Sequence, residues 1–454
     1  MLNEVDYASD RFLKSTKQVA TVGPASSTAE MLKKLYLAGV DVFRLNFSHG
    51  SHDEKRELVK VMRELELELG RPICVLADLQ GPKHRVGMFP DGESSKVSLT
   101  KGQHYRFDLD VEKLGCGERV SLPHPDVMAA LEVGHRVLID DGKLTVVVRE
   151  KGKDYVTTEV MNDATISSRK GFNLPDTEVE SSPLTPKDRE DLEFIVRELD
   201  VDWVALSFVQ KPDDIVELRA LADAAAAPLK ARVKYMAKLE KPNAVSGYLD
   251  SIVQLCDGIM VARGDLGVEM DIESVPITQR RIIDRCQEYG KPVIVATQML
   301  ESMIESPSPT RAEVSDVATA VFDGADAVML SAESAAGKYP VEAVSMQQKI
   351  ITQVEKDLSF RDKINQRREA RSRSTTTTDA ITATARVVAE QVGAKAVVVL
   401  TKSGTTVARA SRERPSVPII AATTLKETSR YLQLAWGVDS ILLEQADFVN
   451  FDGA

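Results

Sequence analysis

The stretch Val233–Gly267, VKYMAKLEKPNAVSGYLDSIVQLCDGIMVARGDLG, holds two short apolar runs separated by a longer segment. The runs are Val233–Leu239 and Gly258–Val261, and each one leads directly into polar residues. A buried strand, a crossing segment and a second buried strand are typical of a parallel sheet, because parallel neighbours need a crossover connection. This unit therefore predicts an α/β fold.

The same unit recurs along the chain. Amphipathic segments lie between most of the apolar runs, and in Glu54–Leu69 the apolar residues recur at helical spacings of three and four. Eight strand and helix units predict a (β/α)₈ TIM barrel. The eight candidate strands are Gln18–Val22, Val40–Phe47, Ile73–Leu79, Val201–Val209, Val233–Leu239, Gly258–Val261, Val293–Thr297 and Ala327–Leu330.

The alternation is interrupted once and ends once. After Pro82 the sequence changes to short alternating strands and turns, which predicts a β-barrel lid domain inserted into the barrel at residues 83–171. The barrel then occupies 1–82, with an N-terminal helix, and 172–342. After a helical stretch, a polar connector is expected at Gln366–Thr378. A C-terminal α/β regulatory domain is expected over 343–454, incomplete at its C-terminus.

Composition limits the classes of protein that remain. The chain has 454 residues, of which 43% are hydrophobic and 28% charged, so it is a folded globular protein of about three domains at ~150 residues each. Its net charge of −11 argues against a nonspecific nucleic-acid binder, and no apolar run is long enough for a membrane span. Four scattered cysteines and the lack of a secretory signal predict a cytoplasmic protein.

Polar residues gather where the predicted strands end, which is where barrel enzymes place their chemistry. Glu240 and Asp265 follow neighbouring strands, and two carboxylates with a substrate phosphate suit Mg²⁺. A structural salt bridge to Lys238 is the alternative for any one strand. Six polar strand ends together favour a site, because burying such groups unpaired costs ~1–3 kcal/mol each. The other polar strand-end residues are Arg44, Asn46, Ser48, Asp78, Thr297, Ser331 and Glu333.

Two loops could bind anions. Gly264–Gly267 is predicted to be a strand-to-helix turn, whose backbone N–H groups could hold a carboxylate or a phosphate. In the third domain the segment TKSGTT, Thr401–Thr406, lies between a predicted strand and a predicted helix. It would suit a phosphate or form a simple helix cap, and the sequence leaves both open.

These motifs resemble those of the pyruvate kinase family along essentially the whole chain, and their residues are most similar to those of the bacterial type II form. The family transfers a phosphoryl group from phosphoenolpyruvate to ADP, giving pyruvate and ATP in glycolysis. The resemblance therefore implies that activity and a homotetramer. The matching segments are FRLNFSHG at Phe43–Gly50, DLQGPKHR at Asp78–Arg85, KGFNLP at Lys170–Pro175, AKLE at Ala237–Glu240, MVARGDLGVE at Met260–Glu269, ATQMLESM at Ala296–Met303 and DGADAVMLSAESAAG at Asp323–Gly337.

The resemblance also implies roles for single residues. Glu240 and Asp265 would bind Mg²⁺, or Mn²⁺ in its place. Lys238 and Arg44 would contact the transferring phosphoryl group, and Arg85 would reach it from the hinge of the lid. The site of the substrate carboxylate and of enolate protonation would involve the backbone of Gly264 and Asp265, the Thr297 hydroxyl, Ser331 and Glu333.

One departure from the family concerns a monovalent cation. Many members bind K⁺ at the positions of Asn46, Ser48, Asp78 and the residue after it, which is Leu79 here rather than threonine. Lys83 stands where those enzymes carry glutamate. A lysine ammonium is a tethered monovalent cation, so we expect activity without K⁺.

A second departure concerns regulation. The family's third domain continues past the position of Ala454, and only the first of its effector loops is present. The residues expected to bind a sugar monophosphate effector there are Thr401, Lys402, Ser403, Thr405 and Thr406.

Two other functions compete with this interpretation. A Mg²⁺-dependent barrel lyase or aldolase would share the acidic pair but would need no lid and no cations directed at a phosphoryl group. A non-catalytic sensor would have lost site residues, yet Arg44, Lys238, Glu240, Asp265 and Thr297 are all intact.

Overall fold

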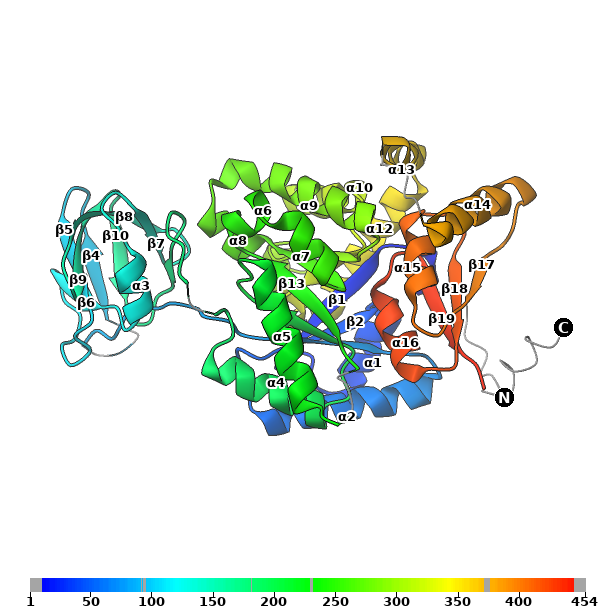
Figure 1. Ribbon diagram of the computed structural model, residues 1–454, viewed down its shortest axis with the longest axis horizontal. Helices are drawn as coiled ribbons and strands as arrows, with labels where there is room; N and C mark the ends of the chain where they lie inside the picture. The colour runs from blue at the N-terminus through cyan, green and yellow to red at the C-terminus, as the bar shows by residue number, and fades with distance from the viewer. Residues whose placement is uncertain are drawn as a thin grey trace.

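A computed structural model describes residues 10–444 except 91, 93–94, 181, 229–231 and 371–375. Figure 1 shows three units in a row: a β unit at one end, a central barrel, and an α/β unit packed against the opposite end of the barrel. The expected N-terminal helix lies mainly outside the described residues, and Asp10–Leu13 form a single 3₁₀ turn.

The central unit is a closed barrel of eight parallel strands, which confirms the predicted fold class. The strands follow one another around the barrel in sequence order, and β1 closes it by pairing with both β2 and β16. Most of them are buried along their whole length. The strands are β1 (Lys17–Val22), β2 (Val42–Asn46), β3 (Cys74–Asp78), β12 (Trp203–Leu206), β13 (Lys234–Leu239), β14 (Gly258–Ala262), β15 (Val293–Ala296) and β16 (Ala327–Leu330).

Strand periodicity divides the apolar side chains of the barrel between two cores. Val19, Met236 and Ile294 belong to a small cluster inside the barrel, whereas Ala237 and Val295 belong to the large layer between strands and helices. Successive side chains point to opposite faces of a strand, so one apolar run supplies both layers.

Helices surround the barrel, and their first turns carry local sequence signals. Ser51 and Thr185 both form capping boxes with an acidic residue three positions later, which satisfies backbone N–H groups at the helix start. The helices are α1 (Ala29–Ala38), α2 (His52–Leu69), α4 (Pro186–Glu198), α5 (Pro212–Ala225), α6 (Pro242–Ser246), α7 (Leu249–Leu255), α8 (Arg263–Glu269), α9 (Val275–Tyr289), α10 (Arg311–Phe322), α11 (Ala332–Ala335) and α12 (Pro340–Lys356).

The inserted unit has its own apolar core, with Tyr105, Phe107 and Phe172 at its centre. A six-stranded sheet, in the order β11-β7-β8-β9-β5-β6, and a two-stranded ribbon, β10-β4, enclose it. Its elements are β4 (Lys96–Leu99), β5 (His104–Asp108), β6 (Arg119–Ser121), α3 (Pro125–Ala130), β7 (Arg136–Ile139), β8 (Leu144–Lys151), β9 (Tyr155–Val160), β10 (Ala164–Ser167) and β11 (Phe172–Asn173).

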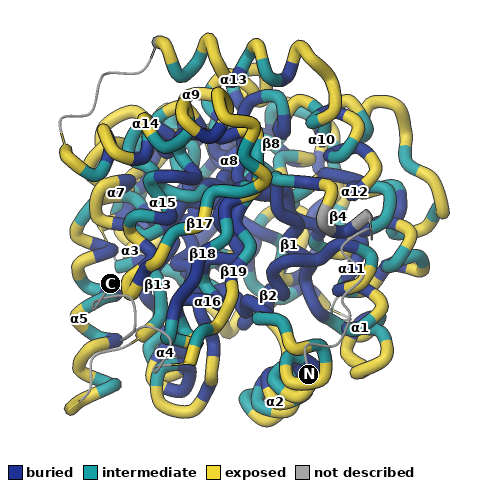
Figure 2. Tube along the Cα trace, turned by 90° about the vertical axis from the view of Figure 1, so that its right-hand side faces the viewer, coloured by how far each residue is buried: buried dark blue, intermediate teal, exposed yellow. Residues whose placement is uncertain are grey.

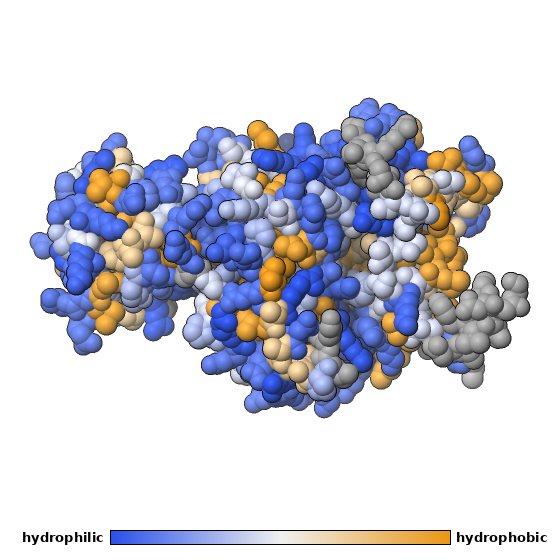
Figure 3. Space-filling view, in the orientation of Figure 1, coloured by the Kyte–Doolittle hydropathy of each residue, from blue (hydrophilic) through white to orange (hydrophobic). Residues whose placement is uncertain are grey.

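The third unit has a parallel three-stranded sheet, β17-β18-β19, with helices packed on it. One side of it is apolar and open: Val392, Val398 and Ile441 are exposed, and Figures 2 and 3 show this face at the end of the molecule. Its elements are α14 (Thr377–Val392), β17 (Val397–Leu400), α15 (Thr405–Arg412), β18 (Ile419–Thr423), α16 (Lys426–Tyr431), the 3₁₀ turn Leu432–Leu434 and β19 (Val438–Leu442).

The predicted connector Gln366–Thr378 is wrong at both ends. Helix α13 (Leu358–Ala370) continues into it, and α14 begins at Thr377, before it ends. Gln366–Ala370 reads QRREA, and these residues favour helix although they are polar. Among the described residues, no helix is both long and apolar enough to cross a membrane.

Candidate functional site

A cluster of buried charges lies where β2, β3 and β13 end. The Arg44 guanidinium donates to Asp78 Oδ2 at 2.7 Å and to the Thr21 hydroxyl at 3.0 Å. The Lys238 ammonium lies 3.4 Å from Asp78 Oδ1 and 3.1 Å from Glu240 Oε1, and donates to Ser207 Oγ at 2.7 Å. The barrel thus brings together two cations and two carboxylates that the sequence placed on three strands.

Two buried carboxylate oxygens of this cluster, Asp78 Oδ1 and Glu240 Oε1, accept no well-formed hydrogen bond from the described residues. Each lies at ion-pair distance from the Lys238 ammonium. Burial raises the pKa of Glu240 to about 7, against the opposing charge of Lys238, and the nearby charge of Asp265 adds to the rise. Burial alone would lower the pKa of Lys238, but the charges of Asp78 and Glu240 outweigh it and raise that pKa.

These oxygens fit a divalent cation. Glu240 is fully buried with one oxygen unsatisfied, and Asp265 raises its pKa, so another positive charge would stabilise both carboxylates. No group of three or more His, Cys, Asp or Glu side chains suited to a metal occurs in the part of the chain that the structure describes. A site here would therefore hold Mg²⁺ with few protein ligands, completed by substrate and water.

Thr297 and Gly264 meet at the ends of β14 and β15. The Gly264 N–H donates to Thr297 Oγ1 at 2.7 Å, and that hydroxyl donates to the Ala296 carbonyl at 2.6 Å. Thr297 has a φ of +68° and Gln298 a φ of +53°, a backbone conformation that costs energy for residues other than glycine. This strained turn points the Thr297 hydroxyl toward the first turn of α8, where Asp265 lies.

Sequence reasoning missed Arg263, which holds this turn in place. Its guanidinium donates to the carbonyls of Thr297 at 2.7 Å and Gln298 at 3.3 Å, and pairs with Asp316 at 2.7 Å. Arg263 directly precedes the GDLG segment, so its position beside candidate site residues was the only available signal.

Ser331 and Glu333 lie at the end of β16. Glu333 is buried, and its two carboxylate oxygens accept the backbone N–H groups of Leu300, at 3.2 Å, and Ser331, at 2.7 Å. Burial raises the pKa of Glu333. The carboxylate therefore ties the loops after β15 and β16 together.

Arg85 lies at the base of the inserted unit. It donates to the Arg169 carbonyl at 2.9 Å, and its backbone N–H donates to the His124 ring at 3.0 Å. It lines a cleft of about 1140 Å³ that also contains His49 from the barrel. Basic residues that the sequence reasoning did not single out line the same cleft, namely Lys96, Arg169 and Lys170.

The residues expected to replace or bind a monovalent cation are only partly together. Asp78 lies in the buried cluster, Leu79 is buried beside it, and Asn46 accepts the Ser48 backbone N–H at 3.0 Å. Lys83 lies near the candidate metal ligand Asp265 instead, with its ammonium 3.8 Å from Asp265 Oδ1.

The loop Thr401–Thr406 is a closed turn at the start of α15. Thr401 Oγ1 accepts the Gly404 N–H at 2.9 Å, and Gly404 has a φ of +74°. Ser403 and Thr405 are exposed, with their hydroxyls 3.1 Å apart, and Lys402 is exposed as well. Helix α16 is hydrogen-bonded to this loop: Tyr431 donates to the Ser403 carbonyl, and Thr428 donates to the Lys402 carbonyl at 2.9 Å.

A closed parallel barrel with an inserted β unit, and with cations and carboxylates buried together at its carboxyl end, is typical of barrel enzymes that act on anionic substrates.

Comparisons with known proteins narrow this class. The family profile "Pyruvate kinase, barrel domain" matches residues 13–344, and "Pyruvate kinase, alpha/beta domain" matches 379–452. A pyruvate kinase of Methylorubrum extorquens is 48% identical over 96% of this chain and 88% of its own, and one of Agrobacterium vitis is 47% identical over 96% and 90%. The crystal structure of a pyruvate kinase from Cryptosporidium parvum superposes with a TM-score of 0.92 at 34% identity, over 99% of this chain and 91% of that one.

The chain therefore belongs to the pyruvate kinase family, the phosphotransferases of glycolysis.

Proposed function

We propose that this chain transfers the phosphoryl group of phosphoenolpyruvate to ADP, giving pyruvate and ATP, with Mg²⁺ held by Glu240 and Asp265. The observation that carries the proposal is the Lys238 ammonium, buried between Asp78 and Glu240 beside two carboxylate oxygens without donors. Phosphoryl transfer depends on positioning and on positive charge around the moving group more than on covalent chemistry.

Each cation of the cluster then has a task. Lys238 and Arg44 neutralise the charge that spreads over the phosphoryl oxygens in the transition state, and Asp78 holds both in position through its two oxygens. A bound Mg²⁺ supplies additional electrophilic stabilisation of those oxygens. Mn²⁺ serves in its place because it accepts the same oxygen ligands.

The substrate carboxylate binds at the first turn of α8. It takes the Gly264 N–H that Thr297 Oγ1 accepts in the free chain, and the backbone of Asp265 lies next to it. The released Thr297 hydroxyl then stands at the face where the enolate is protonated through water. Ser331 and Glu333 complete that side, with Glu333 holding the loop backbone rather than meeting the substrate.

ADP binds in the basic cleft between barrel and lid. Lys83, Arg85 and Lys170 all line it, so polyphosphate is attracted to the same opening through which the lid faces the barrel. A lid that closes there excludes water and protects the phosphoryl group from hydrolysis.

The monovalent cation is replaced by Lys83, so the enzyme works without K⁺. Its ammonium, 3.8 Å from Asp265 Oδ1, supplies a tethered positive charge at the carboxylate pair. Equal initial rates in potassium and in choline chloride at one ionic strength are expected, and a large activation by K⁺ would reject this part.

The domain division expected from the sequence belongs to the same proposal: a barrel at 1–82 and 172–342, a lid at 83–171 and a regulatory unit at 343–454. Separate apolar cores support three units, although the barrel core extends to Ile364 and the lid core includes Phe172. Assembly into a homotetramer in the cytoplasm is part of the proposal, and the open apolar face of β17 and α14 supports association between copies of the chain.

A sugar monophosphate is the proposed effector, bound by the loop Thr401–Thr406, where exposed hydroxyls adjoin the start of α15. Glucose 6-phosphate is expected to shift the phosphoenolpyruvate saturation curve, and Ser403→Ala should reduce that shift. An unshifted curve rejects this effector.

The central test is a coupled pyruvate-formation assay comparing the chain with Lys238→Met. Loss of the ammonium should reduce kcat by about 10²–10³-fold, the scale of one transition-state donor. Lys17→Met is the matched control, because Lys17 is also a buried lysine on a barrel strand but lies at the opposite end, donating to the Val438 carbonyl at 2.6 Å. An undiminished Lys238→Met enzyme would refute the assignment.

A further inference from the structure

A second buried ion pair lies directly beside the candidate metal ligands. The Lys241 ammonium is 2.9 Å from Glu269 Oε2, the Lys241 side chain is 13% exposed and that of Glu269 is 2% exposed. No step of the proposed mechanism uses this pair. Burying a charged group is costly unless it is paired. A buried pair such as this one therefore differs from an ordinary surface salt bridge and calls for an explanation.

The pair joins the same two elements that carry the candidate metal ligands. Lys241 follows Glu240 at the end of β13, and Glu269 is the last residue of α8, one helical turn after Asp265. The ion pair therefore fixes the distance between the strand end that holds one carboxylate and the helix that holds the other.

The same glutamate is bonded to the chain that leaves the lid. Glu269 Oε1 accepts the side-chain N–H of Asn173 at 3.0 Å and the backbone N–H of Leu174 at 3.4 Å. Asn173 ends β11, directly after the segment at which the two crossings between barrel and lid pair with each other. There the Phe172 N–H donates to the His84 carbonyl at 2.9 Å and the Val86 N–H to that of Lys170 at 3.0 Å.

Helix α8 thus contacts both crossings of the lid. Asp265, in its first turn, lies 3.8 Å from the ammonium of Lys83 on the entering crossing. Glu269, in its last turn, holds Asn173 on the returning crossing. A small cavity beside this contact is lined by both crossings and by Lys241 and Glu269, so the three parts meet at one point.

We propose that Lys241, Glu269 and Asn173 form a clamp that positions Asp265 against Glu240 and links this spacing to the hinge of the lid. They are positioning residues, because they act through the backbone of α8 and β13 and through the lid crossing. The inference rests on the proposed function for the role of the two carboxylates, and extends it to three residues outside the reaction site.

The physical reason is that the ion pair and the bonds to Glu269 Oε1 hold a buried carboxylate in place. Without Lys241 the buried Glu269 carboxylate loses its only ion-pair partner among the described residues, and α8 has to move or rotate to hydrate it. Without Asn173 the pair remains but the lid crossing loses its side-chain bond to α8. The first change should therefore disturb the carboxylate pair directly, and the second should disturb mainly the hinge.

The test measures metal binding and hinge protection without turnover. Mn²⁺ is titrated into the full chain in the presence of phosphoenolpyruvate and followed by electron paramagnetic resonance. Hydrogen exchange is measured for the Val86 and Phe172 amides. Lys241→Met is expected to weaken Mn²⁺ binding by about 10–100-fold, as changes behind a metal ligand do, and Lys241→Arg should restore it. Asn173→Ala should speed exchange at the hinge amides, with a smaller loss of Mn²⁺ affinity.

Arg63→Met is the matched control, because Arg63 pairs with buried Asp202 at 3.0 Å at the other end of the barrel. It should lower stability and leave Mn²⁺ affinity and hinge exchange unchanged. If Lys241→Met fails to fold, Asn173→Ala alone decides, and unchanged hinge exchange in it overturns the clamp. Mn²⁺ affinity of folded Lys241→Met equal to that of the unsubstituted chain also overturns it. If the unsubstituted chain neither binds Mn²⁺ nor forms pyruvate, the proposed function fails instead.

Discussion

Both ends of the barrel carry clusters of arginine and carboxylate side chains, but the two clusters differ in how completely their polar atoms are hydrogen-bonded. At the carboxyl end, Asp78 and Glu240 each keep an oxygen without a hydrogen-bond donor. At the amino end, no such side-chain atom occurs on Arg63, Asp202 or Arg430, within the residues that the structure describes. The proposed metal and substrate site lies at the first cluster, where these two oxygens could accept a further positive charge.

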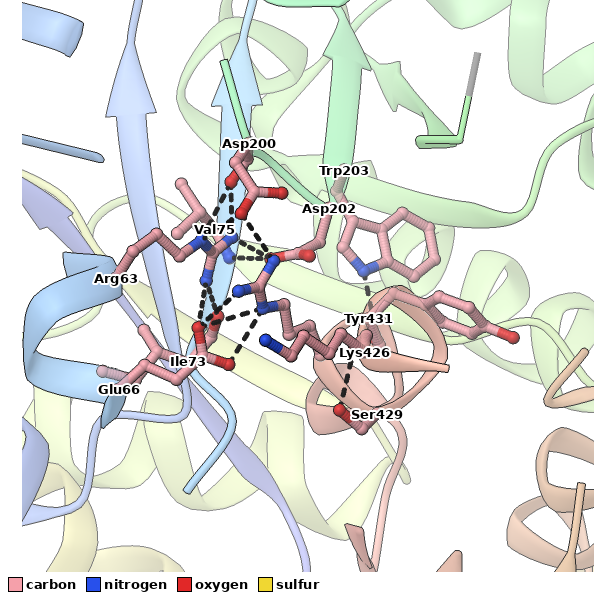
Figure 4. A network of polar contacts seen from close by, with 11 residues as sticks. Arg63, Glu66, Ile73, Val75, Asp200, Asp202, Trp203, Lys426, Ser429 and Tyr431 are labelled. Atoms are coloured by element: carbon pink, nitrogen blue, oxygen red, sulfur yellow. Dashed lines mark hydrogen bonds and ion pairs between the residues drawn. The ribbon is translucent and has the colours of Figure 1, made fainter. Parts of the chain in front are cut away.

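Figure 4 shows the amino-end cluster, with Arg63, Glu66 and Asp202 beside α16 of the third unit. Arg430 of α16 pairs with Glu66 and with Asp200, both at 2.7 Å. Arg63 pairs with Asp202 at 3.0 Å, and the Val75 N–H donates to the same carboxylate at 2.7 Å. The pairs of Arg430 with Glu66 and Asp200 therefore attach the C-terminal unit to this end of the barrel.

The difference shows that burial of charge does not by itself mark a site. The distinguishing feature is whether the protein satisfies the charge, because an unsatisfied buried group is costly unless a ligand completes it. The following experiments challenge this comparison by making equivalent changes at the two ends.

Removing one buried carboxylate charge at each end should have opposite outcomes. Glu240→Gln is expected to reduce kcat by about 10²–10³-fold, because it removes the charge of a proposed metal ligand that also pairs with Lys238. Asp202→Asn, the same change of carboxylate to amide, should leave kcat within about twofold, since the proposed substrate site lies at the opposite end of the barrel. A coupled assay with phosphoenolpyruvate and ADP measures both, and equal losses would contradict the distinction.

The stability of the chain should depend on pH through Asp202, a buried carboxylate at the amino end of the barrel. Burial raises the pKa of Asp202 from 3.8 to about 6, against the opposing charge of Arg63. The folded chain then holds a proton that the unfolded chain has released, so this group's contribution is fully present below pH 3.8 and is lost as pH rises through about 6. That loss is about 3 kcal/mol.

Urea unfolding at several pH values between 4 and 7 tests this expectation. The free energy of unfolding of Asp202→Asn should gain relative to the unsubstituted chain as pH rises across this range. A difference between the two proteins that does not change with pH would contradict the assignment to Asp202.

Removing Arg430, which attaches the third unit to the barrel, should lower stability without lowering activity. Arg430→Met is expected to cost about 2 kcal/mol, because it removes charge-assisted hydrogen bonds to Glu66 and Asp200, both of which keep Arg63 as a neighbour. Denaturant unfolding checks the loss, and kcat at saturating substrate should stay unchanged. A fall in kcat would mean that the amino end communicates with the site.

The smallest expected effect concerns the tethered cation. Lys83→Glu should make the enzyme dependent on K⁺, with a loss of about tenfold in rate without K⁺, equivalent to about 1.4 kcal/mol. Lys143→Glu, on an exposed lid residue outside the cleft, controls for the added negative charge. Rates in potassium and choline chloride separate the two, and a Lys83→Glu enzyme insensitive to K⁺ would count against the proposal.

Much of the barrel was predictable because its signals are local. An apolar run specifies a buried strand, the polar residue after it specifies the strand end, and eight such runs lie in order along the chain. Arg44, Lys238, Glu240 and Asp265 were therefore placed at one end of the barrel before any contact was known. Strand β12 is shorter than its apolar run because Phe208, with a φ of +55°, has already left the sheet.

The contacts that give these residues their properties were not predictable. Lys241 and Glu269 are ordinary charged residues in the sequence, and only the packing of α8 on the end of β13 and on the lid crossing makes them a buried pair. Arg263 was missed for the same reason, since its partners are carbonyl groups after another strand. Likewise, Lys83 was expected to replace the charge of a monovalent cation near Asp78, but its ammonium lies 3.8 Å from Asp265.

The sequence by itself determined the strand order, the end of the barrel that carries polar residues and the family to which the chain belongs, because each depends on residues close together in the chain. Only the tertiary structure decided which buried charges are satisfied. Arg430 reaches Glu66 across 364 positions of sequence, whereas Glu240 Oε1 pairs, among the described residues, with Lys238 alone. The free energy of a buried charge depends on the partners around it in space, and spacing along a single chain does not contain that information.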